Sequence, residues 1–93
     1  MSNYELEVNK WEKLSEIMEE NYDSSKMLRV HNNVAEPARL CVSEEENITN
    51  NVVGRILPQF CEIYVEPGVD LYLKVIPTRG EKSGYNVEIM EVE

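Results

Sequence analysis

The apolar positions near the start of the chain repeat with the period of an α-helix. Residues 4–22 contain no Gly or Pro and are rich in residues that favour helices. Their apolar stripe consists of Trp11, Leu14, Ile17, Met18 and Tyr22. This spacing puts the five side chains on one side of a helix. The pattern therefore predicts an amphipathic helix over residues 4–22 that buries the stripe.

The last third of the chain alternates between apolar and polar residues with the period of a β-strand. Residues 60–65, 70–76 and 85–92 are rich in β-branched and aromatic side chains. The first two runs are joined by Glu66-Pro67-Gly68-Val69, which is typical of a type II turn, and the last two by residues 78–84. These signals predict an antiparallel meander of three strands.

Alternation gives the meander one strongly apolar face, which the N-terminal helix can cover. The residues of this face are Cys61, Ile63, Val65, Leu71, Leu73, Val75, Val87 and Ile89. We therefore expect an α+β fold in which an N-terminal amphipathic helix packs on a small antiparallel sheet. The length of 93 residues predicts a single domain, residues 1–93.

The middle of the chain is less regular. Residues 26–31 and 38–43 are strand-like, and Ser43 followed by Glu46 matches a capping box. A short second helix through residues 48–56, closed by Pro58, would follow. The alternative for residues 44–57 is an acidic loop that leads into a strand.

The opposite face of the meander mixes apolar and acidic side chains. Exposed apolar area of this kind marks interfaces, so a homodimer packed through this face is one interpretation. The other is that the second helix or the first pair of strands covers it within one subunit. The possible dimer face consists of Tyr64, Tyr72, Ile76 and Met90.

Composition indicates a globular cytoplasmic protein. Hydrophobic residues make up 42% of the chain, no apolar run could span a bilayer, and the N-terminus lacks the features of a signal peptide. We expect Cys41 and Cys61, which fall in predicted strands, to be buried reduced thiols rather than disulfide partners or metal ligands.

The chain offers little for catalysis. His31 is the one histidine, and no phosphate loop or nucleophile motif accompanies it. Glu44, Glu45 and Glu46 lack the spacing of a calcium loop. We therefore expect no enzyme activity, catalytic residue, cofactor or metal site. The basic residues are scattered, and the negative field opposes direct contact with nucleic acid or an anionic membrane.

Charge is the strongest remaining signal. There are 18 Asp and Glu against 9 Lys and Arg, a formal net charge of -9. In the predicted helix, Glu5, Glu12, Glu16, Glu19 and Asp23 share one side. Such a row carries one carboxylate per about 5 Å, whereas a DNA strand carries one phosphate per about 3.4 Å. A second row, from the sheet edge or a dimer mate, could complete the pattern and occupy the basic groove of a DNA-binding protein.

The acidic first helix, Glu5 to Asp23, and the acidic strand end, residues 88–93, resemble the small DNA-mimic inhibitors of bacteriophages. Within that group the chain is most similar to the Arn family, the anti-restriction nuclease proteins of T-even phages. The resemblance implies a non-enzymatic homodimer in the host cytoplasm that binds basic host proteins in place of DNA. The implied partners are a restriction endonuclease of the McrBC type and the histone-like nucleoid protein.

The acids expected to mimic phosphates and bind the partner come from both ends of the chain. They are Glu5, Glu12, Glu16, Glu19, Glu20, Asp23, Glu62, Glu66, Asp70, Glu88, Glu91 and Glu93. The alternative function is a protein-interaction module that is not a mimic, such as an antitoxin, immunity protein or complex subunit. In that case the apolar sheet face carries the affinity and acidity serves solubility and steering.

Overall fold

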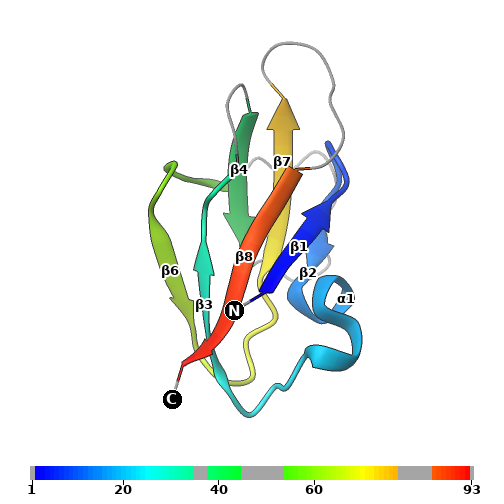
Figure 1. Ribbon diagram of the computed structural model, residues 1–93, viewed down its shortest axis with the longest axis vertical. Helices are drawn as coiled ribbons and strands as arrows, with labels where there is room; N and C mark the ends of the chain where they lie inside the picture. Colours follow the sequence, from blue (N-terminus) through cyan, green and yellow to red (C-terminus); the bar gives the residue numbers. More distant parts are fainter. Residues whose placement is uncertain (1, 35–37, 45–53, 78–84, 93) are drawn as a thin grey trace.

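Two antiparallel sheets of four strands pack face to face and form a β-sandwich (Figure 1). The structure, a computed structural model, describes residues 2–34, 38–44, 54–77 and 85–92. Sheet A, the front sheet in Figure 1, has the order β1-β8-β3-β6, and sheet B behind it has the order β2-β7-β4-β5. Apart from the consecutive strands β4 and β5, neighbouring strands in each sheet are far apart in the sequence, so long-range pairing defines the fold.

The strands are short, and their bounds follow. Sheet A contains β1 (Ser2–Leu6), β8 (Tyr85–Val92), β3 (Met27–His31) and β6 (Glu62–Val65). Sheet B contains β2 (Glu12–Lys13), β7 (Tyr72–Pro77), β4 (Ala38–Ser43) and β5 (Arg55–Leu57). One α-helix, α1 (Leu14–Met18), and one 3₁₀ helix, η1 (Glu19–Asn21), follow β2.

The inner faces of both sheets form one core. Val30 and Val87 from sheet A and Leu40 and Val75 from sheet B are fully buried, and Leu14 of α1 joins them. The predicted alternation is confirmed for most of the expected face, which includes the buried residues Val65, Leu71, Leu73, Val75, Val87 and Ile89. Ile63 is only partly buried, and Cys61 is exposed because it precedes β6 and lies outside the ladder.

The predicted helix over residues 4–22 is wrong. The chain first forms β1, which pairs with β8, then turns through Asn9 at a φ of 58° to β2. Only Leu14–Met18 is α-helical. Pairing with β8 satisfies the backbone groups along one side of β1, and Leu6 is buried, so these long-range gains override a weak local helix preference.

The predicted three-strand meander is also wrong, because its strands do not pair with one another. β6 pairs with β3, β8 lies between β1 and β3, and β7 belongs to sheet B. The turn itself is present: Val69 N donates to Glu66 O at 3.1 Å, and Gly68 has the positive φ, 85°, that a type II turn requires. It carries the chain from one sheet to the other, so that β6 and β7 contribute to the same core from opposite sides.

The strands predicted over residues 26–31 and 38–43 are confirmed as β3 and β4. The proposed capping residue Ser43 instead ends β4, and Ile56 lies in β5 opposite Cys41. Residues 54–56 of the predicted helix are therefore not helical, and its residues 48–53 lie outside the described residues.

The α+β expectation holds in outline only, as antiparallel strands with a short helix near the N-terminus. Within the described residues, no helix is long and apolar enough to cross a membrane.

Candidate protein-interaction surfaces

One end of the sandwich gathers carboxylates from three parts of the sequence. They come from α1 and η1 with the loop after them, from the turn between β6 and β7, and from the end of β8. We call this surface the acidic end, and its carboxylates belong to Glu16, Glu19, Glu20, Asp23, Glu66, Asp70 and Glu91. All seven were predicted as partner-binding acids, and the fold brings them to one end without a long helix.

Hydrogen bonds join two of these parts. The Asp70 carboxylate accepts one bond from Ser15 N at 3.2 Å and another from Ser15 Oγ at 2.6 Å. Gly68 N donates to Ser24 O at 2.8 Å, which fixes the turn against the loop after η1. The carboxylates of the acidic end are therefore presented on a shared framework.

The charges at the acidic end are nearly all of one sign. Among residues 15–26, 66–70 and 91, the sole base is Lys26. Ser25 donates to the Asp23 carboxylate from its hydroxyl and its backbone N–H, and these bonds hold the Asp23 pKa below its ordinary value. Burial, and then the Asp70 charge, raises the pKa of Tyr22. Asp23 therefore stays ionised over a wide pH range.

The remaining predicted acids lie elsewhere. Glu5 and Glu88 lie on the outer face of sheet A, as does Glu62 at its edge. Glu12 belongs to β2, and Glu93 lies outside the described residues. The predicted single row from Glu5 to Asp23 does not exist, because a strand, a turn and a short helix replace the long helix.

Two glutamates on the outer face of sheet A are paired with a base. Arg29 Nε lies 3.3 Å from Glu62 Oε2, and Arg29 Nη2 lies 3.5 Å from Glu88 Oε1. His31 Nδ1 lies 3.8 Å from the same Glu62 oxygen. The strand register produces this cluster, since His31 is opposite both Glu62 and Glu88. Part of the acidity of this face is thus compensated.

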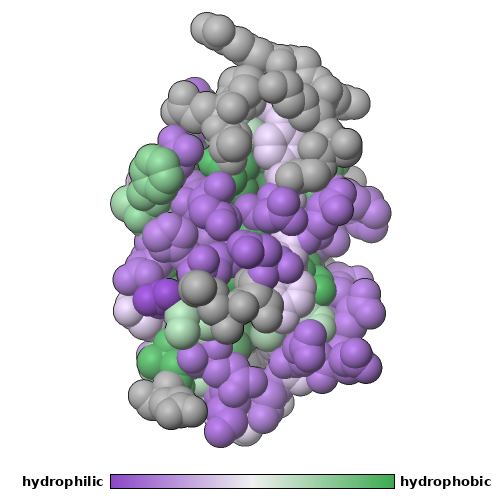
Figure 2. Space-filling view, viewed as in Figure 1, coloured by the Kyte–Doolittle hydropathy of each residue, from purple (hydrophilic) through white to green (hydrophobic). Residues whose placement is uncertain are grey.

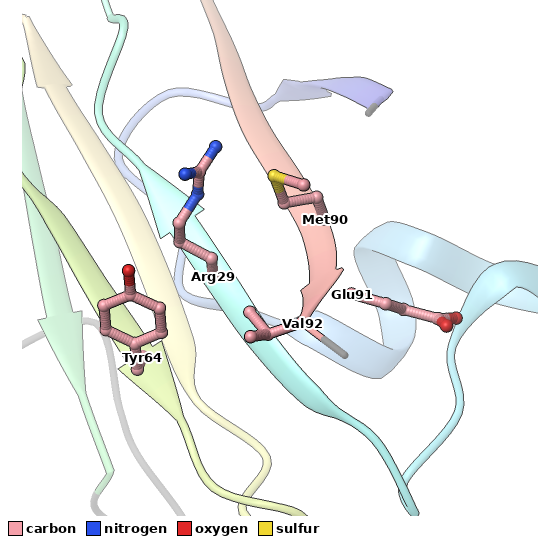
Figure 3. A pocket seen from close by; sticks show the side chains of 5 residues that line it. All are labelled: Arg29, Tyr64, Met90, Glu91 and Val92. Atoms are coloured by element: carbon pink, nitrogen blue, oxygen red, sulfur yellow. The ribbon is translucent and has the colours of Figure 1, made fainter.

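A depression of about 420 Å³ lies beside this cluster. Its lining residues are Arg29, Tyr64, Met90, Glu91 and Val92. Figure 3 shows Arg29, Tyr64 and Met90 projecting from three adjacent strands, while Glu91 points away from them. Two carboxylates already pair with the Arg29 guanidinium, and the depression offers polar and apolar contacts side by side.

The residues of the possible dimer face do not share a surface. Tyr64 and Met90 belong to β6 and β8 of sheet A, whereas Tyr72 and Ile76 belong to β7 of sheet B. Since Leu73 and Val75 between them are buried in the core, Tyr72 and Ile76 lie on the opposite side of the sandwich. A dimer through all four residues is incompatible with this placement.

The outer face of sheet B is basic and aromatic, which sequence reasoning missed. Lys74 Nζ lies 5.6 Å from the centre of the Trp11 ring, and Lys13 Nζ lies 5.8 Å from that of Tyr72. Arg39 follows the same alternation on β4. These residues meet only through strand pairing, which leaves no local signal. Burial raises the pKa of the Cys41 thiol on this face, against the opposing effect of Lys74 and Arg39.

A further surface is a hydrophobic edge along β6 and the turn before it. Ile56, Phe60 and Tyr64 are 55%, 73% and 56% exposed, and they are the large hydrophobic residues that stand out as exposed in the described parts of the chain. Figure 2 shows hydrophobic side chains at its left margin, over the beginning of β6, among hydrophilic ones. We call Phe60 and Tyr64 the hydrophobic edge; Ile56 lies opposite Cys41, on the outer face of sheet B. Phe60 and Tyr64 were predicted on an outer face, while Ile56 was assigned to the second helix.

Buried Asn32 holds the turn that carries Phe60. Asn32 Nδ2 donates to Leu57 O at 2.8 Å, and Asn32 Oδ1 accepts from Val34 N at 2.9 Å. The Asn32 backbone accepts from Phe60 N at 2.8 Å and donates to Cys61 O at 2.9 Å. Phe60 has a φ of 65°, a strained conformation for this residue.

The described residues contain no group of three or more His, Cys, Asp or Glu that could hold a metal ion. A scan against protein-family models, a search of curated proteins and a search of solved structures found no match to this chain.

Proposed function

We propose that this protein is a non-enzymatic inhibitor that binds the basic, DNA-contacting surface of a partner protein. The observation that carries the proposal is the acidic end, whose segments, residues 15–26, 66–70 and 91, carry seven carboxylates and one lysine. In its specific form the proposal places the protein with the bacteriophage DNA mimics, which act on host restriction endonucleases and nucleoid proteins.

The charge distribution supports a basic partner. Carboxylates of one sign on one end create a field that steers a basic surface toward that end and raises the association rate. Most of these side chains are exposed, so a partner can pair with them. The hydrogen bonds from Ser25 hold the pKa of the Asp23 carboxylate below its ordinary value, which favours the charged form. The acidic end thus provides the exposed negative charge that was expected from a row along the predicted helix.

The acidic end differs from a regular array of phosphates. Its carboxylates come from separate elements, with Asp70 fixed by Ser15 and Asp23 fixed by Ser25. A single subunit therefore offers a compact acidic patch instead of two long rows. Binding to part of a DNA site, with duplex DNA as a competitor, is the expected mode.

The second candidate is an interaction module that binds mainly through apolar contacts. The hydrophobic edge favours it, since Phe60 and Tyr64 are 73% and 56% exposed and aromatic side chains are frequent anchors of interfaces. In this case acidity provides steering and solubility. The two candidates differ in whether charge reversal at the acidic end removes binding.

The test uses purified histone-like nucleoid protein and a McrBC-type endonuclease as partners. Their binding to the immobilised protein is measured at about 0.05 M and about 0.3 M salt, because screening over this range weakens contacts between exposed charges. We expect at least about a tenfold loss at the higher salt and competition by duplex DNA.

Charge-matched variants locate the contact. The triple variant Glu19→Lys, Glu20→Lys, Asp23→Lys should lose binding. The control variant Glu5→Lys, Glu7→Lys, Glu44→Lys changes the net charge equally, at exposed residues outside the acidic end, and should keep most of it. Equal losses in both variants, or binding that ignores salt and DNA, would contradict the proposal.

A further inference from the structure

We infer that the open edge of β6 is a docking site for an extended basic segment of a partner protein, which adds to sheet A as a further strand. Within the described residues, β6 pairs with β3 on one side only, at the end of the strand order. The inference does not require the proposed function, because it rests on the backbone edge of β6 and shares only Glu66 with the acidic end.

The backbone of β6 presents hydrogen-bonding groups at this edge. Cys61 O accepts from Asn32 N while Cys61 N donates to Pro58 O, so the N–H and C=O groups of Ile63 and Val65 in β6 face β3. Because the direction alternates along a strand, the groups of Glu62 and Tyr64 point away from β3. An added strand can pair with these two residues, which is the contact used in β-strand addition.

Two aromatic side chains flank the paired positions. Tyr64 is 56% exposed on the outer face of β6, and Phe60 is 73% exposed just before it. Phe60 adopts a positive φ that favours Gly or Asn, and four hydrogen bonds of Asn32 maintain the surrounding turn. The fold therefore holds an aromatic ring beside the edge at a conformational cost, as expected for an anchor of a partner segment.

The charges of the edge select a basic segment. Between Ile56 and Leu73 the sequence contains acids but no Lys or Arg. Glu62 lies on the outer face of β6, where Arg29 and His31 of β3 approach the Glu62 Oε2 oxygen, and exposed Glu66 follows the strand. Side chains of an added strand alternate with period two, so those opposite Glu62, Tyr64 and Glu66 share the outer face. Lys or Arg at alternate positions would meet a carboxylate, the tyrosine ring and a second carboxylate.

A second copy of this chain does not fit the edge. In an antiparallel pair of two β6 strands, centring on Tyr64 places Glu62 opposite Glu66 of the other copy, and centring on Ile63 places Glu62 opposite Tyr64. Centring on Glu62 places two carboxylates opposite each other. No register supplies an opposite charge, and like charges directly opposite are destabilising.

The test uses a blocked peptide of about seven residues with alternating lysine and valine. Its binding to the ¹⁵N-labelled protein is followed by NMR at about 0.15 M salt, where the Debye length is about 8 Å. We expect the largest amide shifts at Glu62 and Tyr64. N-methylation of the lysines removes the donors that face β6 and should weaken binding at least about tenfold, whereas N-methylation of the valines should change it less than about twofold.

Protein variants supply the matched controls. Phe60→Asn tolerates the positive φ, so it should keep or raise the melting temperature while weakening the peptide about fivefold. Tyr64→Thr should weaken it similarly, and Tyr72→Thr on the opposite sheet should not. The triple variant at Glu19, Glu20 and Asp23 should keep binding within about threefold. The outcome of the peptide experiment does not depend on whether a DNA-binding partner is found for the acidic end.

Three outcomes would overturn the inference. The first is absence of peptide binding, or equal binding of both N-methylated peptides. The second is a set of shifts confined to the acidic end, which would indicate attraction by charge alone. The third is a dimer, seen by sedimentation, whose contacts protect the Glu62 and Tyr64 amides.

Discussion

The hydrophobic edge and the acidic end are anchored in different ways. At the edge, the buried Asn32 side chain forms hydrogen bonds with Leu57 and Val34. The Asn32 backbone forms hydrogen bonds with Phe60 and Cys61. At the acidic end, carboxylates anchor the loops and remain available at the surface, as Asp23 does with Ser25. The exposed apolar side chains are therefore held in place by a buried residue, whereas the loops of the acidic end are held by carboxylates that themselves lie at the surface.

This difference has a consequence for how each surface can vary. Exposed charges at the acidic end can be exchanged at little cost in stability, because surface charge pairs contribute little. The hydrophobic edge cannot lose its anchor without leaving buried polar groups unpaired. Substitutions of exposed acids at the acidic end should therefore change binding with little effect on stability. A substitution of Asn32 should change both.

The largest effect is expected for Asn32→Ala. It leaves Leu57 O and Val34 N without their side-chain partner, and we expect a loss of about 3 kcal/mol in the free energy of unfolding. Urea denaturation measures it. The control Asn33→Ala changes an exposed neighbour that bonds the Asn3 side chain at 3.2 Å and should cost about 0.5 kcal/mol or less. Similar losses of stability in the Asn32→Ala and Asn33→Ala variants would mean that the buried hydrogen bonds of Asn32 do not anchor the hydrophobic edge.

A smaller effect is expected for Asp70→Ala, the most buried anchor of the acidic end. The variant loses both bonds from Ser15, and we expect a cost of about 1–2 kcal/mol by the same measurement. Glu66→Ala in the same turn should cost about 0.5 kcal/mol or less, because Glu66 is exposed. A loss for Asp70→Ala as large as that for Asn32→Ala would show that the acidic end also depends on a buried anchor.

The smallest effect concerns the titration of Asp23. Its folded-state pKa is lowered below 3.8, so the group contributes stability above its unfolded pKa and loses it as the pH falls through the folded pKa. Ser25→Ala removes the largest cause, the hydroxyl bond, and should raise the Asp23 pKa toward its ordinary value. NMR titration of the carboxyl carbon measures this. An unchanged pKa would mean that Ser25 does not hold the charge.

Strand positions were predictable from the sequence because alternation is a local signal. Leu71, Leu73 and Val75 alternate around polar neighbours, and their burial followed from that pattern. The pairing of strands was not predictable in this way. β1 meets β8 from the far end of the chain, and no feature of residues 2–6 specifies that partner.

The error over residues 4–22 has a physical cause. Leu14 and Met18 are buried on a real helical turn, so the stripe was correct over that stretch. Trp11 fitted the same spacing but lies on the outer face of sheet B, against Lys74. Carboxylates at three- and four-residue steps are typical of a helix, but the same spacing is also compatible with a strand followed by a turn.

For the candidate surfaces too, the sequence predicted the residue types but not how the fold brings them together. The acids themselves were predictable as residue types, but their gathering at the acidic end required the contact between Ser15 and Asp70, which are far apart in the sequence. The hydrophobic edge needed the positive φ of Phe60 and the buried position of Asn32. Neither property has a signature in residue spacing.

Trp11 provides the protein with an internal optical reporter. It is the single tryptophan of the chain, and its ring lies over Gly54, where an added Cβ would come within 2.6 Å of the indole. Neither surface proposed to bind a partner includes it. Its emission should therefore follow the loosening of sheet B, while ligands at the acidic end or at β6 leave the spectrum almost unchanged. Folding and binding can then be followed in the same sample by separate signals.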